Sequence, residues 1–324
     1  VADVSTLTSE VVGFDAFDAR RDELASAGIV LKKGVDPSTD LEPEYIAVSG
    51  GKAYVTLQEN NAIAVLDLAS RTFDGIYSAG FEDYSVTPID IDKKDDYGGL
   101  MGIRMPDGIA AFQVDGKTYL VTANEGDARE WGDEDLGTFY LSEDEQDFGE
   151  EGVTSPTGAI TGENSGLEGK VVFFKVEDFD GLDSGKDYLF GGRTFTIYEA
   201  GENGVTEVFT SGNDFETLTA RYLTDYYNCS NDNTVVDDRS GKKGPEAESV
   251  TVGTVDGRTY AFVALERTGG VMVYDVTEPA SAQYVNYINT RDFASIVEGS
   301  EEYEDGELDK WVTGGDVAPE GLLF

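Results

Sequence analysis

The chain has 324 residues, of which 40% are hydrophobic and 11% aromatic, enough to fill the core of one large domain or two ordinary ones. Its formal charge of −42 comes from 65 acids against 23 bases and excludes a nucleic-acid-binding protein, because phosphate contacts need clustered lysine and arginine. The lack of histidine excludes histidine-dependent hydrolases and histidine-ligated zinc or iron sites. The single cysteine excludes an internal disulfide, and no apolar stretch is long enough for a transmembrane segment.

In chain order, the first expected element is a short amphipathic helix within residues 15–27. Further along, short segments alternate apolar with polar residues and are rich in β-branched and aromatic side chains, which is typical of strands. Expected strands cover residues 52–57, 62–67, 118–122, 170–176, 193–198, 260–264 and 271–276. The pattern therefore predicts an all-β fold.

One segment recurs along the chain. VDGKTY at residues 114–119 returns as VDGRTY at 255–260, and each copy follows a proline–acid pair and precedes a strand that ends on a glutamate. A third copy covers residues 43–59, and a fourth begins at Pro319. Repetition of β segments at a long period predicts a radial or solenoid array.

The repeat spacing sets the expected architecture. Proline–acid pairs at 43–44, 106–107, 245–246 and 319–320 define units of about 63 to 74 residues, which suit the four-stranded blades of a β-propeller. The interval after residue 106 spans two units, so residues 191–198 are interpreted as the outer strand of a copy without the proline–acid pair. We expect one propeller domain over residues 1–324, C-terminally incomplete, with about five blade-sized units here and seven in the complete protein.

Two segments are expected to be long loop insertions, near residues 128–169 and 226–244, because they are rich in glycine, acids or polar residues. The second contains the sequon Asn228-Cys229-Ser230, so Asn228 is a candidate glycosylation site of a secreted protein.

Repeated acids are the candidate site residues, because a propeller brings equivalent positions around one axis. One set lies at the start of the innermost strands, and a second set ends the next strands. Converging carboxylates raise one another's pKa or recruit cations, and Ca²⁺ accepts six to eight oxygen ligands. The expected Ca²⁺ ligands are Glu44, Glu59, Asp107, Asn124, Glu125, Glu248 (or its neighbour Glu246), Glu266 and Glu320.

Two alternatives to metal binding remain open for these acids. Arg104, Arg129 and Arg267 could neutralise them as ion pairs, and Arg129 and Arg267 could also hold an anion. The acids could instead accept hydrogen bonds from backbone amides at turns, which repetition supports as well as it supports a metal. Most of the remaining acids are assigned to a solvated surface.

The same segments resemble a known family. TANEGDARE at residues 122–130, PDGIA at 106–110 and the segments 41–48, 55–65, 243–248 and 265–271 are similar to the choice-of-anchor I domain proteins. That family includes mesenchyme-specific cell-surface glycoproteins and bacterial members labelled phytase-like or alkaline-phosphatase-like. The resemblance implies a secreted or surface-anchored β-propeller that binds calcium and whose activity is poorly defined.

Two functions are carried as hypotheses. The first is an acidic Ca²⁺-binding propeller, extracellular or at the cell surface with a lumenal compartment as the alternative, that acts as a binding or structural module for a protein or extracellular-matrix partner. The second is a calcium-dependent phosphomonoesterase, in which metal-bound water attacks a phosphate held by arginine or lysine. So few bases facing so many acids argue against an anionic substrate.

Overall fold

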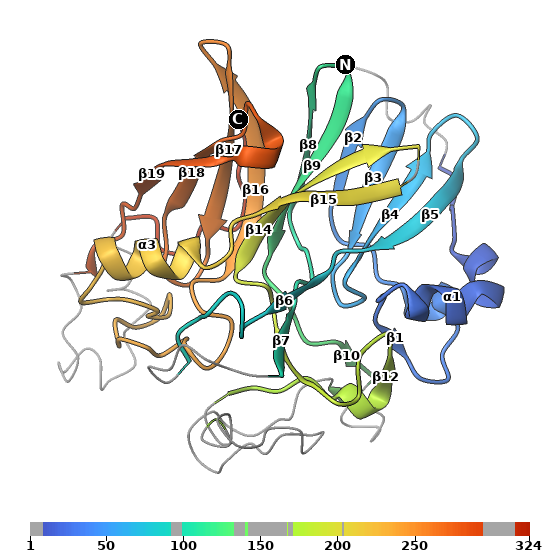
Figure 1. The fold of residues 1–324 in the computed structure, drawn as a ribbon, viewed down its shortest axis with the longest axis horizontal. Coiled ribbons are helices and arrows are strands. Elements are labelled where there is room, and N and C mark those ends of the chain that lie inside the picture. The colour runs from blue at the N-terminus through green and yellow to red at the C-terminus, as the bar shows by residue number, and fades with distance from the viewer. Residues whose placement is uncertain are drawn as a thin grey trace.

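The computed structural model describes residues 9–91, 99–132, 140–141, 167, 171–202, 204–293 and 315–324. Three four-stranded antiparallel sheets form most of this part of the chain (Figure 1), so the all-β prediction is confirmed. The first sheet contains β2 (Ile46–Ser49), β3 (Lys52–Leu57), β4 (Ala62–Asp67) and β5 (Thr72–Ser78). The middle sheet contains β8 (Ile109–Val114), β9 (Lys117–Asn124), β14 (Thr194–Gly201) and β15 (Gly204–Thr210). The third contains β16 (Ala247–Val255), β17 (Arg258–Leu265), β18 (Val271–Asp275) and β19 (Gln283–Ile288).

The middle sheet corrects the expected number of units. β14 pairs with β9 from Thr194 opposite Asn124 to Ala200 opposite Thr118, so residues 191–198 do not belong to a separate unit. The unit that opens at Pro106 is instead interrupted by a long insertion between its second and third strands. The separate unit expected around residues 191–198 is therefore wrong, and the described residues contain three complete four-stranded units.

Most of the loop expected near 128–169 lies outside the described residues; where the structure describes the insertion and its surroundings, it shows short elements. They are β10 (Glu130–Trp131), β11 (Tyr140–Leu141), the 3₁₀ helix η4 (Val176–Asp178), β12 (Phe179–Asp180) and β13 (Asp187–Phe190). β13 lies parallel to β7 (Leu100–Ile103), which pairs with β6 (Phe81–Asp83), and β12 pairs with β1 (Leu31–Lys32). The strand expected at 170–176 is wrong where the structure describes it, because an isolated bridge between Phe173 and Leu189 replaces it.

The helices are short. The 3₁₀ helix η2 (Asp15–Arg20) continues into α1 (Arg21–Ser26), which confirms the helix expected within residues 15–27. The sequence did not predict α3 (Asp214–Tyr222). The other helical turns are α2 (Pro37–Asp40) and η5 (Pro279–Ser281). Within the described residues, no helix has the length and apolar character needed to cross a membrane. The segment 226–244, expected to be a loop, contains no helix or strand.

The repeated VDGK/R segment is explained by its turn. Asp115 and Gly116 both have positive φ, 50° and 79°, and join β8 to β9 in a two-residue hairpin loop. Asp256 and Gly257 adopt the same values between β16 and β17. Positive φ at both positions is the geometry that favours Asp-Gly in tight hairpins. The motif is therefore a turn signal that recurs between the leading two strands of the middle and third sheets.

The three sheets pack face to face, with the middle sheet between the others. One apolar cluster joins the middle and third sheets, and another joins the first and middle sheets. The first cluster includes Val121, Phe195, Ile197, Val263 and Tyr274, and the second includes Tyr54, Ile63, Leu120 and Tyr198. The leading strand of the middle sheet, β8, contacts the leading strands of both neighbours, β2 and β16. Equivalent ends of the three sheets are thereby brought together.

Candidate functional site

The repeated acids lie where consecutive sheets meet. The Gly108 amide, next to Asp107, donates a hydrogen bond of 3.0 Å to the Glu248 carbonyl, which joins the start of β8 to the start of β16. Within the third sheet, the Glu266 amide donates to the Glu246 carbonyl at 2.8 Å. The Glu44 amide likewise bonds the backbone of β3. We call this set of carboxylates the acidic hub: Glu44, Glu59, Asp107, Glu125, Glu246, Glu248 and Glu266.

One half of the hub is neutralised by bases. Carboxylate oxygens of Glu125, Glu246 and Glu266 all lie within 4.8 Å of one another. Lys243 Nζ lies 2.7 Å from Glu125 and 2.6 Å from Glu246, and Arg267 lies 3.0 Å from Glu266 and 3.3 Å from Glu246. These three acids therefore face two bases inside the cluster. We call them the paired half.

Glu246 is the centre of the paired half. It is buried, it has a positive φ of 62°, and it also receives an ion pair of 2.6 Å from Arg239. Burial by itself would raise the pKa of this carboxyl, but Lys243, Arg239 and Arg267 outweigh burial and lower the pKa to about 2. Glu246 is therefore ionised at every physiological pH.

The other half of the hub has no such bases. Among the described residues, none of Glu59, Asp107 and Glu248 forms an ion pair, and the buried Oε2 atoms of Glu59 and Glu248 have no hydrogen-bond partner. We call these three acids the unpaired half. Burial, followed by the charges of Glu125 and Glu44, raises the pKa of Asp107 to about 8.

The other two acids respond in the same way. Burial raises the pKa of Glu59 to about 7, and burial together with a hydrogen bond to Glu266 raises the pKa of Glu248 to about 9. Two carboxyl groups can hydrogen-bond only if one of them carries a proton. Without a cation, Glu248 and Glu266 therefore share a proton, whereas a bound cation would allow both to ionise.

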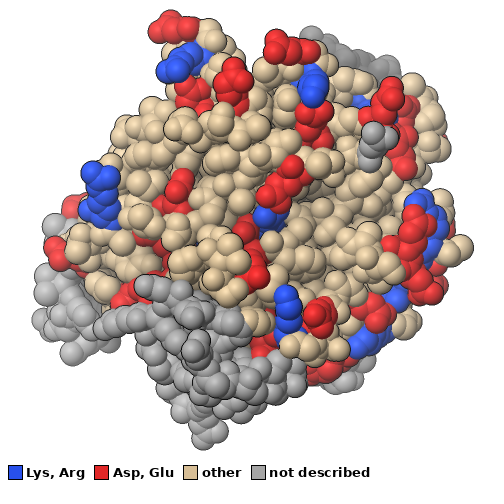
Figure 2. All heavy atoms as spheres, in the orientation of Figure 1, with Lys and Arg blue, Asp and Glu red and all other residues tan. Residues whose placement is uncertain are grey.

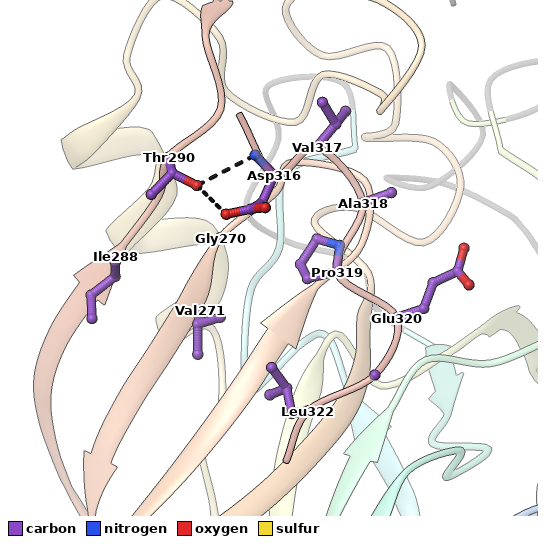
Figure 3. Close-up of a pocket in the computed structure, with 11 residues that line it drawn as sticks. Gly270, Val271, Ile288, Thr290, Asp316, Val317, Ala318, Pro319, Glu320 and Leu322 are labelled. Carbon is purple, nitrogen blue, oxygen red and sulfur yellow. Dashed lines mark hydrogen bonds between the residues drawn. The ribbon is translucent and has the colours of Figure 1, made fainter. Parts of the chain in front are cut away.

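Glu44 and Glu320 lie at the exposed margin of the hub. The charge of Asp107, burial, and then the charges of Glu248, Glu44 and Glu320 raise the pKa of the Tyr45 phenol. Glu320 follows Pro319 on the C-terminal segment, beside a hollow of about 580 Å³ over β18 and β19 (Figure 3). Its side chain extends away from Val271 and Ile288. Glu320 therefore lies within electrostatic reach of the hub without belonging to it.

Asn124 lies outside the hub, although it was expected to be a ligand. Its side chain is fully buried in the middle sheet, where Oδ1 accepts a hydrogen bond from Thr122 and Nδ2 donates to the hydroxyls of Thr194 and Thr196, each at 2.8 Å. These contacts tie β9 to β14. Asn124 therefore holds the sheet together and offers no ligand toward the acids.

The arginines expected to neutralise the acids divide among separate places. Arg267 lies in the paired half, as expected. Arg129 is buried and forms ion pairs with Asp40, at 2.6 Å from guanidinium nitrogen to carboxylate oxygen, and with Glu42, at 3.3 Å. Arg104 pairs with Glu82 at 2.8 Å, in a network that does not include the hub acids. Arg104 is therefore not the counter-ion that the sequence suggested.

The sequon is also placed by the structure. Asn228 is fully buried, and its Nδ2, the atom that a glycan would occupy, donates a hydrogen bond of 3.0 Å to the Ser240 hydroxyl. A glycan needs this nitrogen to face solvent. The folded chain therefore leaves no room for glycosylation at Asn228.

Sequence reasoning missed part of the paired half. It did not single out Arg239, or Gln58, whose Nε2 donates a hydrogen bond of 2.9 Å to Glu125. Lys243 and Arg239 both come from the irregular segment 226–244, so no periodicity pointed to them as a pair. Glu246 was expected only as the alternative to Glu248, although it follows Pro245 just as Glu44 follows Pro43.

The comparisons with known proteins fix the family. A family model described as the choice-of-anchor I domain matches residues 1–279. This chain belongs to the choice-of-anchor I domain family. A curated relative, the mesenchyme-specific cell surface glycoprotein of Strongylocentrotus purpuratus, is 29% identical over 210 residues. The match covers 56% of this chain and 27% of that protein.

Solved structures resemble this member of the family only weakly. A putative 6-phosphogluconolactonase from Bacteroides uniformis is 14% identical, covering 77% of this chain and 58% of the other, with a TM-score of 0.25. A protein from Lactobacillus plantarum is 13% identical, covering 78% and 72%, with a TM-score of 0.19. With TM-scores this low, neither structure establishes a shared fold or function.

Proposed function

We propose that this choice-of-anchor I domain is a calcium-binding β-propeller module of a secreted or surface-associated protein, and that it serves as a binding or structural unit. The observation that carries the proposal is the uneven neutralisation of the hub. Three bases serve the paired half, whereas the acids of the unpaired half have none. A divalent cation would supply the missing positive charge.

The propeller part of the proposal is supported by the way the sheets follow one another. Each sheet is a four-stranded meander in sequence order, each leading strand contacts the next, and Pro319 repeats the signal that opens the other units. A radial array continues in this way until it closes. In such an array the hub acids would line the axis.

The chemistry of the unpaired half favours Ca²⁺ over other ions. Ca²⁺ prefers carboxylate and carbonyl oxygens and tolerates irregular geometry, whereas Mg²⁺ demands a near-ideal octahedron and transition metals prefer nitrogen or sulfur ligands. Asp107, Glu248 and Glu59 supply carboxylates, and Glu266 and the exposed Glu44 lie close by. The ion would replace the proton that Glu248 and Glu266 otherwise share.

The surface location is supported by the relative, which is named a cell surface glycoprotein. A protein or extracellular-matrix partner fits that name.

The phosphomonoesterase alternative has less support. Among the described residues of the hub, Lys243, Arg239 and Arg267 are all engaged by carboxylates, so none of them is available to hold a phosphate.

Calcium titration tests the proposal. Thermal unfolding is followed with rising Ca²⁺, with Mg²⁺ and with EGTA, and binding is measured by calorimetry. A ligand that binds only the folded state stabilises it by about 2.7 kcal/mol at a hundred times its Kd, so the melting temperature rises with Ca²⁺. The double variant Asp107→Asn/Glu248→Gln loses this response.

The matched control is Asp115→Asn/Asp256→Asn, which removes two charges at hairpin turns far along the strands from the hub and keeps the full response. An unchanged melting temperature of the wild type in Ca²⁺, or an equal loss in both double variants, refutes the calcium site. Calcium-dependent hydrolysis of p-nitrophenyl phosphate that is lost in Asp107→Asn/Glu248→Gln would favour the enzyme instead.

A further inference from the structure

A groove of about 730 Å³ lies between the first and middle sheets, apart from the acidic hub. We call it the rim groove and define it by Lys52, Tyr54, Asp74, Tyr77, Lys117 and Glu199. Its volume is within the range of small-molecule sites, about 300–1,000 Å³.

The rim groove lies at the opposite end of the sheets from the hub. Glu44 precedes β2 and Glu59 follows β3, so both hub acids lie at one end of this hairpin. Gly50 and Lys52, which line the groove, lie at its other end, where β2 turns into β3. A ligand in the groove would therefore be independent of a cation at the hub.

Local packing keeps this groove open. On the other side of the β8–β9 turn, Val114 and Tyr119 belong to the apolar cluster that fills the space between the middle and third sheets, together with Val276 and Ala282. On the groove side the chain uses a glycine. A Cβ at Gly204, whose φ is +109°, would lie 2.2 Å from the ring of Tyr77, so the ring rests directly on the backbone there.

The charges around the groove occur as neutral pairs. In each sheet, the base that opens the second strand pairs with the acid at or near the end of the third: Lys52 with Asp67 at 3.7 Å, Lys117 with Glu199 at 2.9 Å and Arg258 with Asp275 at 3.2 Å. Red and blue atoms accordingly lie side by side on the projections along the upper edge of Figure 2. Lys52 also contacts Asp74.

Two of these pairs flank the groove, so its lining is close to neutral although the protein carries a charge of −42. A cation would meet Lys52 and Lys117, and an anion would meet Asp74, Glu199 and Glu202. Each wall instead offers a donor beside an acceptor. A hydroxyl group, which both donates and accepts, satisfies such a wall.

The floor between the walls is aromatic and aliphatic. Tyr54 and Val65 are buried, whereas Tyr77 is half-buried and supplies the accessible apolar surface within a polar frame. A ligand matched to this lining is uncharged, rich in hydroxyl groups and apolar on one face. We propose that the rim groove binds a saccharide unit, with its ring over Tyr77 and its hydroxyls on Lys52, Lys117, Asp74 and Glu199.

Saturation-transfer NMR on the 324-residue chain tests this proposal. The probes are neutral disaccharides, namely cellobiose, lactose, maltose and N,N′-diacetylchitobiose, and a sulfated heparin disaccharide. All spectra are recorded in EGTA, so that a failure of the calcium proposal does not affect the result. At least one neutral probe is expected to receive saturation, and the sulfated probe is not.

Two variants locate the binding. Lys117→Gln replaces the charged donor of the groove by a shorter, neutral amide and lowers affinity by about tenfold or more, because hydrogen bonds to a charged group are the strong ones. Arg258→Gln is the matched control, since it makes the equivalent change in the third sheet, outside the groove, and leaves affinity unchanged. The absence of transfer to every neutral probe, preferential binding of the sulfated probe, or an equal effect of the two variants overturns the proposal.

Discussion

Replacing Glu246 by glutamine tests how strongly the paired half of the hub stabilises the fold. The side chain is buried and ion-paired with Arg239, Lys243 and Arg267. Because a tenfold change in proton affinity is worth about 1.4 kcal/mol, the lowering of its pKa from 4.5 to about 2 corresponds to about 3 kcal/mol. Removing one partner from a buried ion pair costs about 3–5 kcal/mol, which agrees with this value.

Chemical denaturation in EGTA at pH 7 measures the effect as a lower midpoint of unfolding with an unchanged m-value. We expect Glu246→Gln to lose about 3 kcal/mol and the exposed control Asp115→Asn to change by less than about 0.5 kcal/mol. Because folding lowers the pKa of Glu246, its contribution to stability is fully present above pH 4.5 and is lost as pH falls toward 2. A loss below about 1 kcal/mol for Glu246→Gln would refute the view that its three bases stabilise the folded hub.

Two further predictions concern the unpaired half and the segment 226–244. The pKa values of Asp107 and Glu248 are raised to about 8 and about 9, so the folded state holds more protons than the unfolded state above about pH 4.5. In EGTA the melting temperature should therefore fall as pH rises toward 9. Saturating Ca²⁺ should make the melting temperature less dependent on pH. Glu216→Gln removes the buried partner of Arg193, which also donates hydrogen bonds to the carbonyls of residues 240 and 242. We expect the free energy of unfolding to fall by about 3–5 kcal/mol and the buried Cys229 thiol to react faster with a disulfide reagent. Equal thiol reactivity in wild type and variant would contradict the role of this ion pair in holding the segment 226–244.

Much of the hub could be predicted because it repeats. The Asp-Gly turns fix the hairpins, the hairpins fix where each strand begins and ends, and the acids at those positions meet when the sheets pack in succession. Glu44, Asp107, Glu125, Glu248 and Glu266 are therefore found together from a sequence pattern alone. Asn124 occupies a repeated position as well, but its neighbours Thr194 and Thr196 come from a strand 70 residues further on, and the sequence does not reveal that contact.

The number of units could not be predicted from spacing. A stretch of two unit lengths can hold a unit without its signature or one unit with a long insertion, and both give the same distance between proline–acid pairs. Pairing of β14 with β9 shows that the stretch holds one unit with an insertion.

The helix α3 was missed because its buried Glu216 is stabilised by Arg193, a residue from outside the helix. A buried acid lowers the helical signal in the sequence.

The division of the hub into two halves has its origin outside the repeats. Both acids lie at the start of β16, yet Glu246 is held ionised at a pKa of about 2 while Glu248, two residues away, has a pKa of about 9. The difference arises because Arg239 and Lys243 both enter from the segment 226–244, which interrupts the pattern and has no counterpart in the first sheet. An array of identical sectors would make a ring of equal carboxylates that repel one another. The irregular segment leaves one side of the hub neutral and the other still requiring a proton or a cation, so the place that a cation would occupy under our proposal is set by the part of the chain that does not repeat.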